Sequence, residues 1–87
     1  MKRPLNYEIL KYFTKVDKAS AQDVYRELAG EFKDHKAFKL ANIIESLMTA
    51  KANGLIDEES YKLEGDELVV YYKASDEQKS TINSYIK

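Results

Sequence analysis

A run of polar residues recurs at helical spacing in the middle of the chain. Lys39, Asn42, Ser46, Thr49 and Asn53 are separated by three or four positions. On a helix this spacing places them in one narrow stripe. Asparagine can pair with adenine, lysine can reach guanine, and serine and threonine can donate to bases or phosphates. The stripe contains no acid, so it indicates a base-reading surface formed by Lys39, Asn42, Ser46 and Thr49; the alternative is an ordinary solvated face.

A second set of basic residues is suited to the phosphate backbone of a nucleic acid. Its three candidates are Arg3, Lys18 and Lys36. Lys18 lies just before a predicted helix start at Ser20, where free backbone N–H groups attract anions. For any single one of these side chains, the alternative is scattered solvation at the surface.

The composition gives little support to catalytic or metal chemistry. The chain has no cysteine and one histidine, His35, which lies in a polar stretch. This composition excludes disulfides, thiolate sites and nearly every zinc constellation. The acids at 57–59 lack the ligand pattern of a calcium loop, and the three glycines form no phosphate loop. We therefore expect a protein that is not an enzyme and that has no metal or cofactor.

The charge is nearly balanced, but it is unevenly distributed. Lys and Arg number 14 and Asp and Glu number 15, for a formal net charge of −1. Residues 1–39 carry nine bases and six acids (+3), whereas residues 40–87 carry five bases and nine acids (−4). The stretch 57–67 has six acids and one lysine, a balance of −5. A near-neutral total is not typical of a strongly basic nucleic-acid binder, so the location of the charge matters more than its sum.

With 87 residues, of which 44% are apolar and 33% charged, the chain is expected to form one globular domain over 1–87. After the basic start, Asn6, Glu8 and Lys11 interrupt the apolar stretch that a signal peptide needs. No run approaches the length of a membrane span. These features predict a cytoplasmic protein without membrane contact.

Apolar periodicity predicts three helices before residue 54. They span residues 4–15, 20–30 and 36–53. Ser20 followed by Asp23 is a capping-box-like start for the second helix, and Gly54 is a suitable stop for the third. The third helix is apolar over more than half of its circumference, so we expect it at the centre of the fold. The predicted core includes Ile44, Leu47 and Leu28.

The chain then changes to an alternating pattern that predicts a β-hairpin over 60–73 and a C-terminal helix over 76–86. Gly65 occupies the first central position of a type II′ turn, and the helix opens with a capping box at Ser75. The hairpin is apolar on both faces, so one face needs a cover. We expect a homodimer through the C-terminal helix, formed by Ile82, Tyr85 and Ile86. The alternative is that this helix docks internally.

Several short motifs resemble bacterial winged helix-turn-helix regulators. Leu47 followed by Gly54-Leu55-Ile56 is similar to the end of their recognition helix, and Ser20-Ala21-Gln22-Asp23-Val24 is similar to their second helix. Tyr72-Lys73-Ala74-Ser75 resembles the exit from the wing in PadR-type and MarR-type regulators. The resemblance covers about residues 5–86. It implies an α+β winged helix: three helices, a two-stranded wing and a C-terminal helix.

Two features depart from that pattern. The link between the second and third helices, residues 30–36, is longer than the usual turn. The hairpin tip carries Glu64, Asp66 and Glu67, where DNA-binding wings usually carry basic residues. Two hypotheses follow. The first is a dimeric transcriptional regulator that binds double-stranded DNA and reads the major groove with residues 36–53. The second is a winged-helix interaction module whose acidic wing docks a basic protein.

Overall fold

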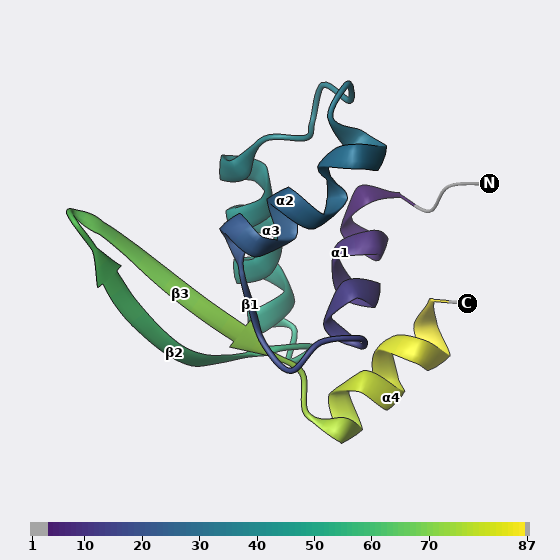
Figure 1. Ribbon diagram of the computed structural model, residues 1–87. Coiled ribbons are helices and arrows are strands. Elements are labelled where there is room, and N and C mark those ends of the chain that lie inside the picture. Colours follow the sequence, from purple (N-terminus) through teal and green to yellow (C-terminus); the bar gives the residue numbers. More distant parts are fainter. Residues whose placement is uncertain (1–3, 87) are drawn as a thin grey trace.

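The computed structural model describes residues 4–86 as four helices and a three-stranded antiparallel sheet (Figure 1). The α+β class is as predicted. The elements are α1 (Leu5–Phe13), β1 (Ala19–Ser20), α2 (Ala21–Phe32), α3 (Leu40–Ala52), β2 (Asp57–Glu64), β3 (Glu67–Lys73) and α4 (Asp76–Tyr85). The strand order is β1-β3-β2, so the sheet has a third strand that the two-stranded prediction missed. The two residues of β1 pair with Tyr72 and Tyr71 of β3, which anchors the wing to the helical body.

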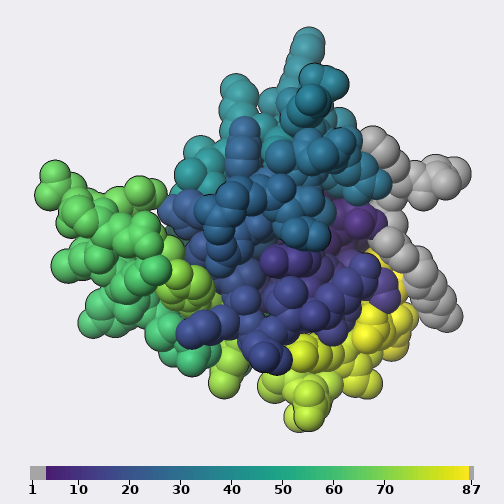
Figure 2. Space-filling view, in the orientation of Figure 1, coloured from purple at the N-terminus to yellow at the C-terminus, as the bar shows by residue number. Residues whose placement is uncertain are grey.

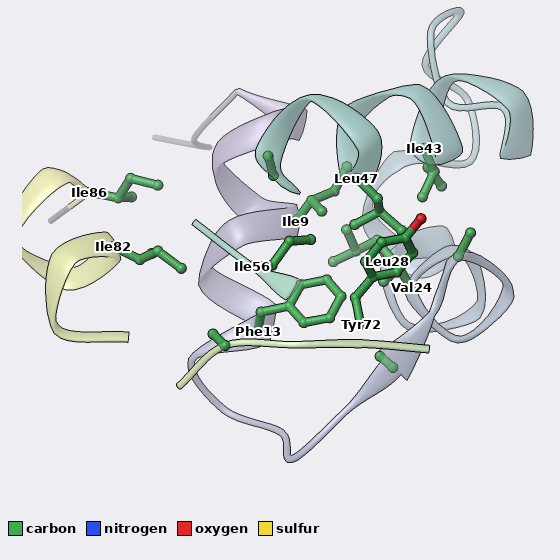
Figure 3. Packing of buried hydrophobic residues seen from close by; sticks show 14 of the residues in the cluster. Ile9, Phe13, Val24, Leu28, Ile43, Leu47, Ile56, Tyr72, Ile82 and Ile86 are labelled. Carbon is green, nitrogen blue, oxygen red and sulfur yellow. The ribbon is translucent and has the colours of Figure 1, made fainter. Parts of the chain in front are cut away.

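The core lies where α1, α2 and α3 meet the inner end of the wing (Figure 3). Leu47 and Leu28 are buried, as predicted. Ile44 is 40% exposed, whereas its neighbour Ile43 is fully buried, so the prediction for Ile44 was wrong. Because apolar residues cover more than half of this helix, their pattern does not determine which side turns inward.

The second helix begins as its sequence predicts and ends later. The Ser20 hydroxyl accepts the N–H of Asp23 at 3.1 Å, and the Asp23 carboxylate accepts the N–H of Ser20 at 3.0 Å, which completes the capping box. The predicted end at Gly30 is two residues too early, because α2 continues to Phe32. The side chain of Phe32 is 4% exposed and extends the buried stripe of Leu28 by one turn.

The third helix begins at Leu40, four residues after the predicted start at 36. Phe38 explains the delay: it is buried, with its ring stacked on Tyr25 at 4.7 Å between centroids and 6.2 Å from that of Phe32. Lys39, the N-cap residue, has extended backbone angles. The core contact of Phe38 therefore holds the preceding segment out of the helix.

The end of α3 and the turn of the wing both depend on a glycine. Gly54, at φ +78°, donates to the carbonyl of Lys51 at 3.0 Å, and Leu55 donates to that of Ala50 at 2.9 Å. These two bonds form a Schellman motif, which confirms Gly54 as the stop. Gly65 has φ +62° and Asp66 does not have positive φ, in keeping with the predicted type II′ turn. The wing begins at Asp57, three residues before the predicted 60.

The C-terminal helix docks on the same chain. Ser75 and Gln78 form the predicted capping box, with bonds of 3.1 and 2.8 Å. Ile82 and Ile86 are 1% and 3% exposed and point from α4 toward α1 (Figure 3). Their assignment to a dimer interface was therefore wrong, because this chain already covers them. Tyr85, at 75% exposed, is the member of that set whose side chain remains accessible.

Candidate nucleic-acid interface

Helix α3 has three sides with different chemistry. Ile43, Leu47 and Ala50 face the core. At about 100° per residue, the side farthest from the core is formed by exposed residues, namely Ala41, Glu45, Met48 and Ala52. The polar stripe lies between these two sides, so it is not the outermost face of the helix. A duplex laid along the middle of α3 would meet apolar and acidic groups first.

The polar stripe borders a groove between α1 and α3 of about 500 Å³. Asn42, Ser46 and Thr49 line it from α3, together with Leu5 and Asn6 from α1. Asn42 and Thr49 are exposed, and Ser46 is half-buried. The structure thus brings three of the four predicted base-reading residues together, but on the α1 side of the helix. Their role in base reading stays a prediction.

Lys39 lies apart from these three, at the start of α3. It is the N-cap residue and makes no capping hydrogen bond with its side chain. The first turn that follows contains no acid, and Lys36 and Lys39 are both exposed. The amide of Asn42 donates to the carbonyl of Ala37 at 2.9 Å, which fixes the loop that leads into the helix. α2 and α4, by contrast, each begin with a complete capping box.

Lys18 is engaged by the wing. Its ammonium group lies 3.7 Å from a carboxylate oxygen of Glu59 and 5.2 Å from the ring centre of Tyr71. The hydroxyl of Ser60, and to a smaller extent Lys18, holds the pKa of Glu59 below its ordinary value. About half of the Lys18 side chain remains exposed. Its assignment to a phosphate stays a prediction, now with a competing partner in the chain; Arg3 lies outside the described residues.

The acids of the wing are largely paired within the chain. Glu58 binds Lys51, Glu64 binds Lys62 at 2.8 Å, and Glu67 accepts a hydrogen bond from Gln22 at 2.9 Å. Residues 57–67 alone sum to −5; adding Lys18 and Lys51, which pair with Glu59 and Glu58, gives −3. The sequence could not show the contacts of Lys18 with Glu59 and of Gln22 with Glu67, because these residues are 41 and 45 positions apart in the chain. The wing is still negative, though less so than the sequence suggested.

The structure also exposes a set of large apolar side chains that the sequence analysis did not identify. They are Ile44 and Met48 on α3 and Tyr61, Leu63 and Leu68 on the wing. Figure 2 shows the wing as a lobe that projects from the helical body. The alternation of Tyr61 and Leu63 beyond the core end of the hairpin was the available sequence signal.

Comparison with known proteins shows the fold and no family. No protein-family model matches the chain, and no curated protein matches it. Among solved structures, GAS PerR in a form named PerR-Zn-Zn is similar, with a TM-score of 0.62 and 21% identity. The similarity covers 85% of this chain and 44% of the PerR chain. PerR is a Fur-family regulator. The four helices and three-stranded sheet described here are thus compatible with a winged helix.

Two further observations concern metals and membranes. Within residues 4–86, no group of three or more His, Asp or Glu side chains is arranged to hold a metal ion. In the same part of the chain, no helix has the length and apolar character needed to cross a membrane.

Proposed function

We propose that this chain is a small winged-helix DNA-binding protein that regulates transcription and contacts the duplex with the N-terminal end of α3. The observation that carries the proposal is the start of α3, which has no side-chain cap and directly follows a segment with exposed Lys36 and Lys39. The protein acts without catalysis and without a cofactor. Similarity to PadR-type or MarR-type regulators and residence in the bacterial cytoplasm remain predictions.

An uncapped helix start is suited to a phosphate. The first N–H groups of a helix have no partner within the helix, and the positive end of the helix dipole lies there. A phosphate can accept from these groups, and nearby lysines add charge. The Ser20 and Ser75 hydroxyls already satisfy such a group at the starts of α2 and α4. The start of α1 at Pro4 also has no side-chain cap, so it is the exposed Lys36 and Lys39 that favour an anion at the start of α3.

The distribution of charge favours an end-on approach. Glu45 lies on the outermost side of α3, so a duplex lying along its middle would face an acid. Lys33, Lys36 and Lys39 precede the helix, with Asp34 among them, for a local balance of +2. In helix-turn-helix proteins the N-terminal residues of the recognition helix make the base contacts. Lys39 and Asn42 occupy that position here, while the acidic wing tip stays away from the phosphates.

The fold similarity to PerR supports this proposal at the level of architecture. The order of elements, with α3 followed by the β2–β3 hairpin, is the order expected of a recognition helix and a wing. This chain spans less than half of the PerR chain, so dimerisation and effector binding are not carried over from it.

A salt titration against duplex DNA tests the proposal. Binding should weaken as salt rises, because each neutralised phosphate releases counterions. The double variant Lys36→Ala/Lys39→Ala should reduce the slope of log K against log salt by about 1.8. Lys79→Ala, on α4 away from the start of α3, is the matched control and should leave the slope unchanged. Absence of salt-dependent binding at low ionic strength, or equal slopes for all three proteins, would contradict the proposal.

A further inference from the structure

The groove between α1 and α3 has the size of a small-molecule site. Its volume is about 500 Å³, and ligand pockets usually enclose about 300–1,000 Å³. The larger apolar side chains that line it come from α1 and from the residue that follows Gly54; they are Leu5, Ile9, Leu10 and Leu55. Leu5, Leu10 and Leu55 are only partly buried. An apolar molecule in the groove would therefore remove apolar surface from water.

The α3 side of the groove is polar. Asn42, Ser46 and Thr49 line it, together with Asn53 at the end of the helix and Asn6 from α1. Ligand sites commonly combine an apolar lining with a few polar groups that fix the orientation of the ligand. The polar stripe of α3 is thus one wall of a groove whose other wall is mainly apolar.

The charge of the groove favours a cation. Among the described residues that line it, Glu45 is the only charged one. Glu45 precedes Thr49 by one helical turn, so it lies at the outer rim. Within residues 4–86, its carboxylate forms no ion pair. Since no lysine or arginine of this part of the chain lines the groove, a carboxylate or phosphate ligand would meet repulsion from Glu45 and no attraction.

The hydrogen-bonding groups favour a ligand that donates. The amide nitrogen of Asn42 already donates to the carbonyl of Ala37 at 2.9 Å, so the amide oxygen is the atom suited to a ligand. The hydroxyls of Ser46 and Thr49 can accept as well as donate, and the carboxylate of Glu45 only accepts. An ammonium group combines several donors with a positive charge. We propose that the groove binds a small organic amine with an apolar body, a function beyond DNA contact at the start of α3.

Two other occupants fit the groove less well. A divalent metal ion such as calcium takes several oxygen ligands, and residues 4–86 contain no group of three or more side chains arranged to hold one. A DNA duplex would bring phosphates to the rim at Glu45, where no described lysine or arginine lines the groove. It would also leave the apolar side chains of α1 without an apolar partner.

An NMR titration with a simple amine tests this inference. The probe is phenethylamine. The controls are 3-phenylpropionate, which carries a carboxylate in place of the ammonium group, and uncharged 2-phenylethanol. We expect the amine to cause saturable amide shifts at the residues that line the groove, with a dissociation constant of about 1 mM. Both controls should bind more weakly, and the carboxylate should be the weakest of the three.

Two variants separate the charge of the groove from its shape. Glu45→Gln removes the charge at the rim, so it should weaken amine binding by about two- to fivefold and leave the binding of 2-phenylethanol unchanged. Ser46→Leu fills the groove and should weaken amine binding by at least about tenfold. The matched controls are Glu77→Gln and Ser80→Leu, at exposed positions of α4 outside the groove. Both should bind the amine like the unaltered chain.

Other outcomes overturn the inference. No saturable shift from the amine at about 10 mM would show that the groove does not bind it. Equal binding of the amine and the carboxylate would remove the charge argument. Equal losses for Ser46→Leu and Ser80→Leu would place the amine elsewhere. Far-UV circular dichroism shows whether each variant is folded; if Ser46→Leu is not, Thr49→Leu fills the same groove from an exposed position. The salt titration against DNA contains none of these probes, so the proposed function can fail without this inference, and the reverse.

Discussion

The start of α3 and the wing are opposite in charge and also in how their polar groups are satisfied. At the wing, Glu58, Glu59 and Glu64 each have a lysine partner within the chain. At the start of α3, Lys39 provides no cap, and no acid follows in the first turn. Lysines inside and outside the wing therefore neutralise part of its negative charge, whereas the start of α3 leaves donors and positive charge accessible. The comparison shows that the number of charged residues in a segment does not indicate whether its surface can bind a charged partner.

The largest expected effect is on stability, and it tests which side of α3 is buried in the core. Leu47 is fully buried in the core, so Leu47→Ala should reduce the free energy of unfolding by about 2–5 kcal/mol. The adjacent Met48 is 60% exposed, so Met48→Ala should change it by less than about 0.5 kcal/mol. Chemical denaturation of the two variants measures both values. Equal losses at the two positions would contradict the orientation assigned to α3.

The orientation of α3 is also where the sequence was least informative. Helix identities, the two capping boxes, the Gly54 stop and the hairpin turn depend on neighbours within a few residues, and all were predictable from sequence. Which of Ile43 and Ile44 faces inward depends on how α3 packs against the other elements. The same applies to β1, a two-residue strand that exists because Ala19 and Ser20 lie opposite Tyr72 and Tyr71.

For the candidate site, the sequence predicted the polar stripe on α3 but not where the fold places it. The polar stripe of α3 does occur along one side of a helix, as its spacing indicated. Its position beside α1 could not be predicted, because helical spacing alone does not give the direction of the core. The partners of Lys18 and Lys51 on the wing are 41 and 7 residues away in sequence, and only folding brings them together. For α4, internal docking buried Ile82 and Ile86, two of the three residues assigned to a dimer.

Capping α3 should separate its stability from its proposed function. Lys39→Asp places a carboxylate where it can accept a first-turn N–H group, which should stabilise the fold by about 0.5–1 kcal/mol. The same change should weaken DNA binding, because it fills the proposed phosphate position and reverses the charge. Thermal unfolding and the salt titration measure the two effects. Stronger DNA binding by Lys39→Asp would contradict the proposed contact.

Ser20→Ala is the reverse case. It removes an existing cap and should reduce the free energy of unfolding by about 0.5–2 kcal/mol.

A smaller effect is expected from neutralising the wing tip. Glu64→Gln, Asp66→Asn and Glu67→Gln together remove negative charge without large changes in shape. At low salt, nonspecific DNA affinity should rise modestly, because the substitutions reduce the repulsion between the wing and the phosphates. At higher salt the effect should be smaller, because salt screens this repulsion. Discrimination between sequences should not change. A loss of DNA affinity in this variant would show that the wing takes part in the contact, against the separation of the two regions.

The smallest expected effect is on the pKa of Glu59, and it tests whether Lys18 binds the wing in solution. The folded chain lowers the pKa of Glu59, chiefly through the Ser60 hydroxyl and further through Lys18. A carboxyl whose pKa is lowered on folding stabilises the folded state when the pH is above the ordinary glutamate pKa of about 4.3. This contribution to stability is lost as the pH falls through the lower pKa of the folded state. In an NMR titration, Ser60→Ala should therefore raise the pKa of Glu59 more than Lys18→Ala does. If Lys18→Ala leaves that pKa unchanged, the wing does not hold Lys18 in solution, and this lysine becomes available again as a phosphate ligand.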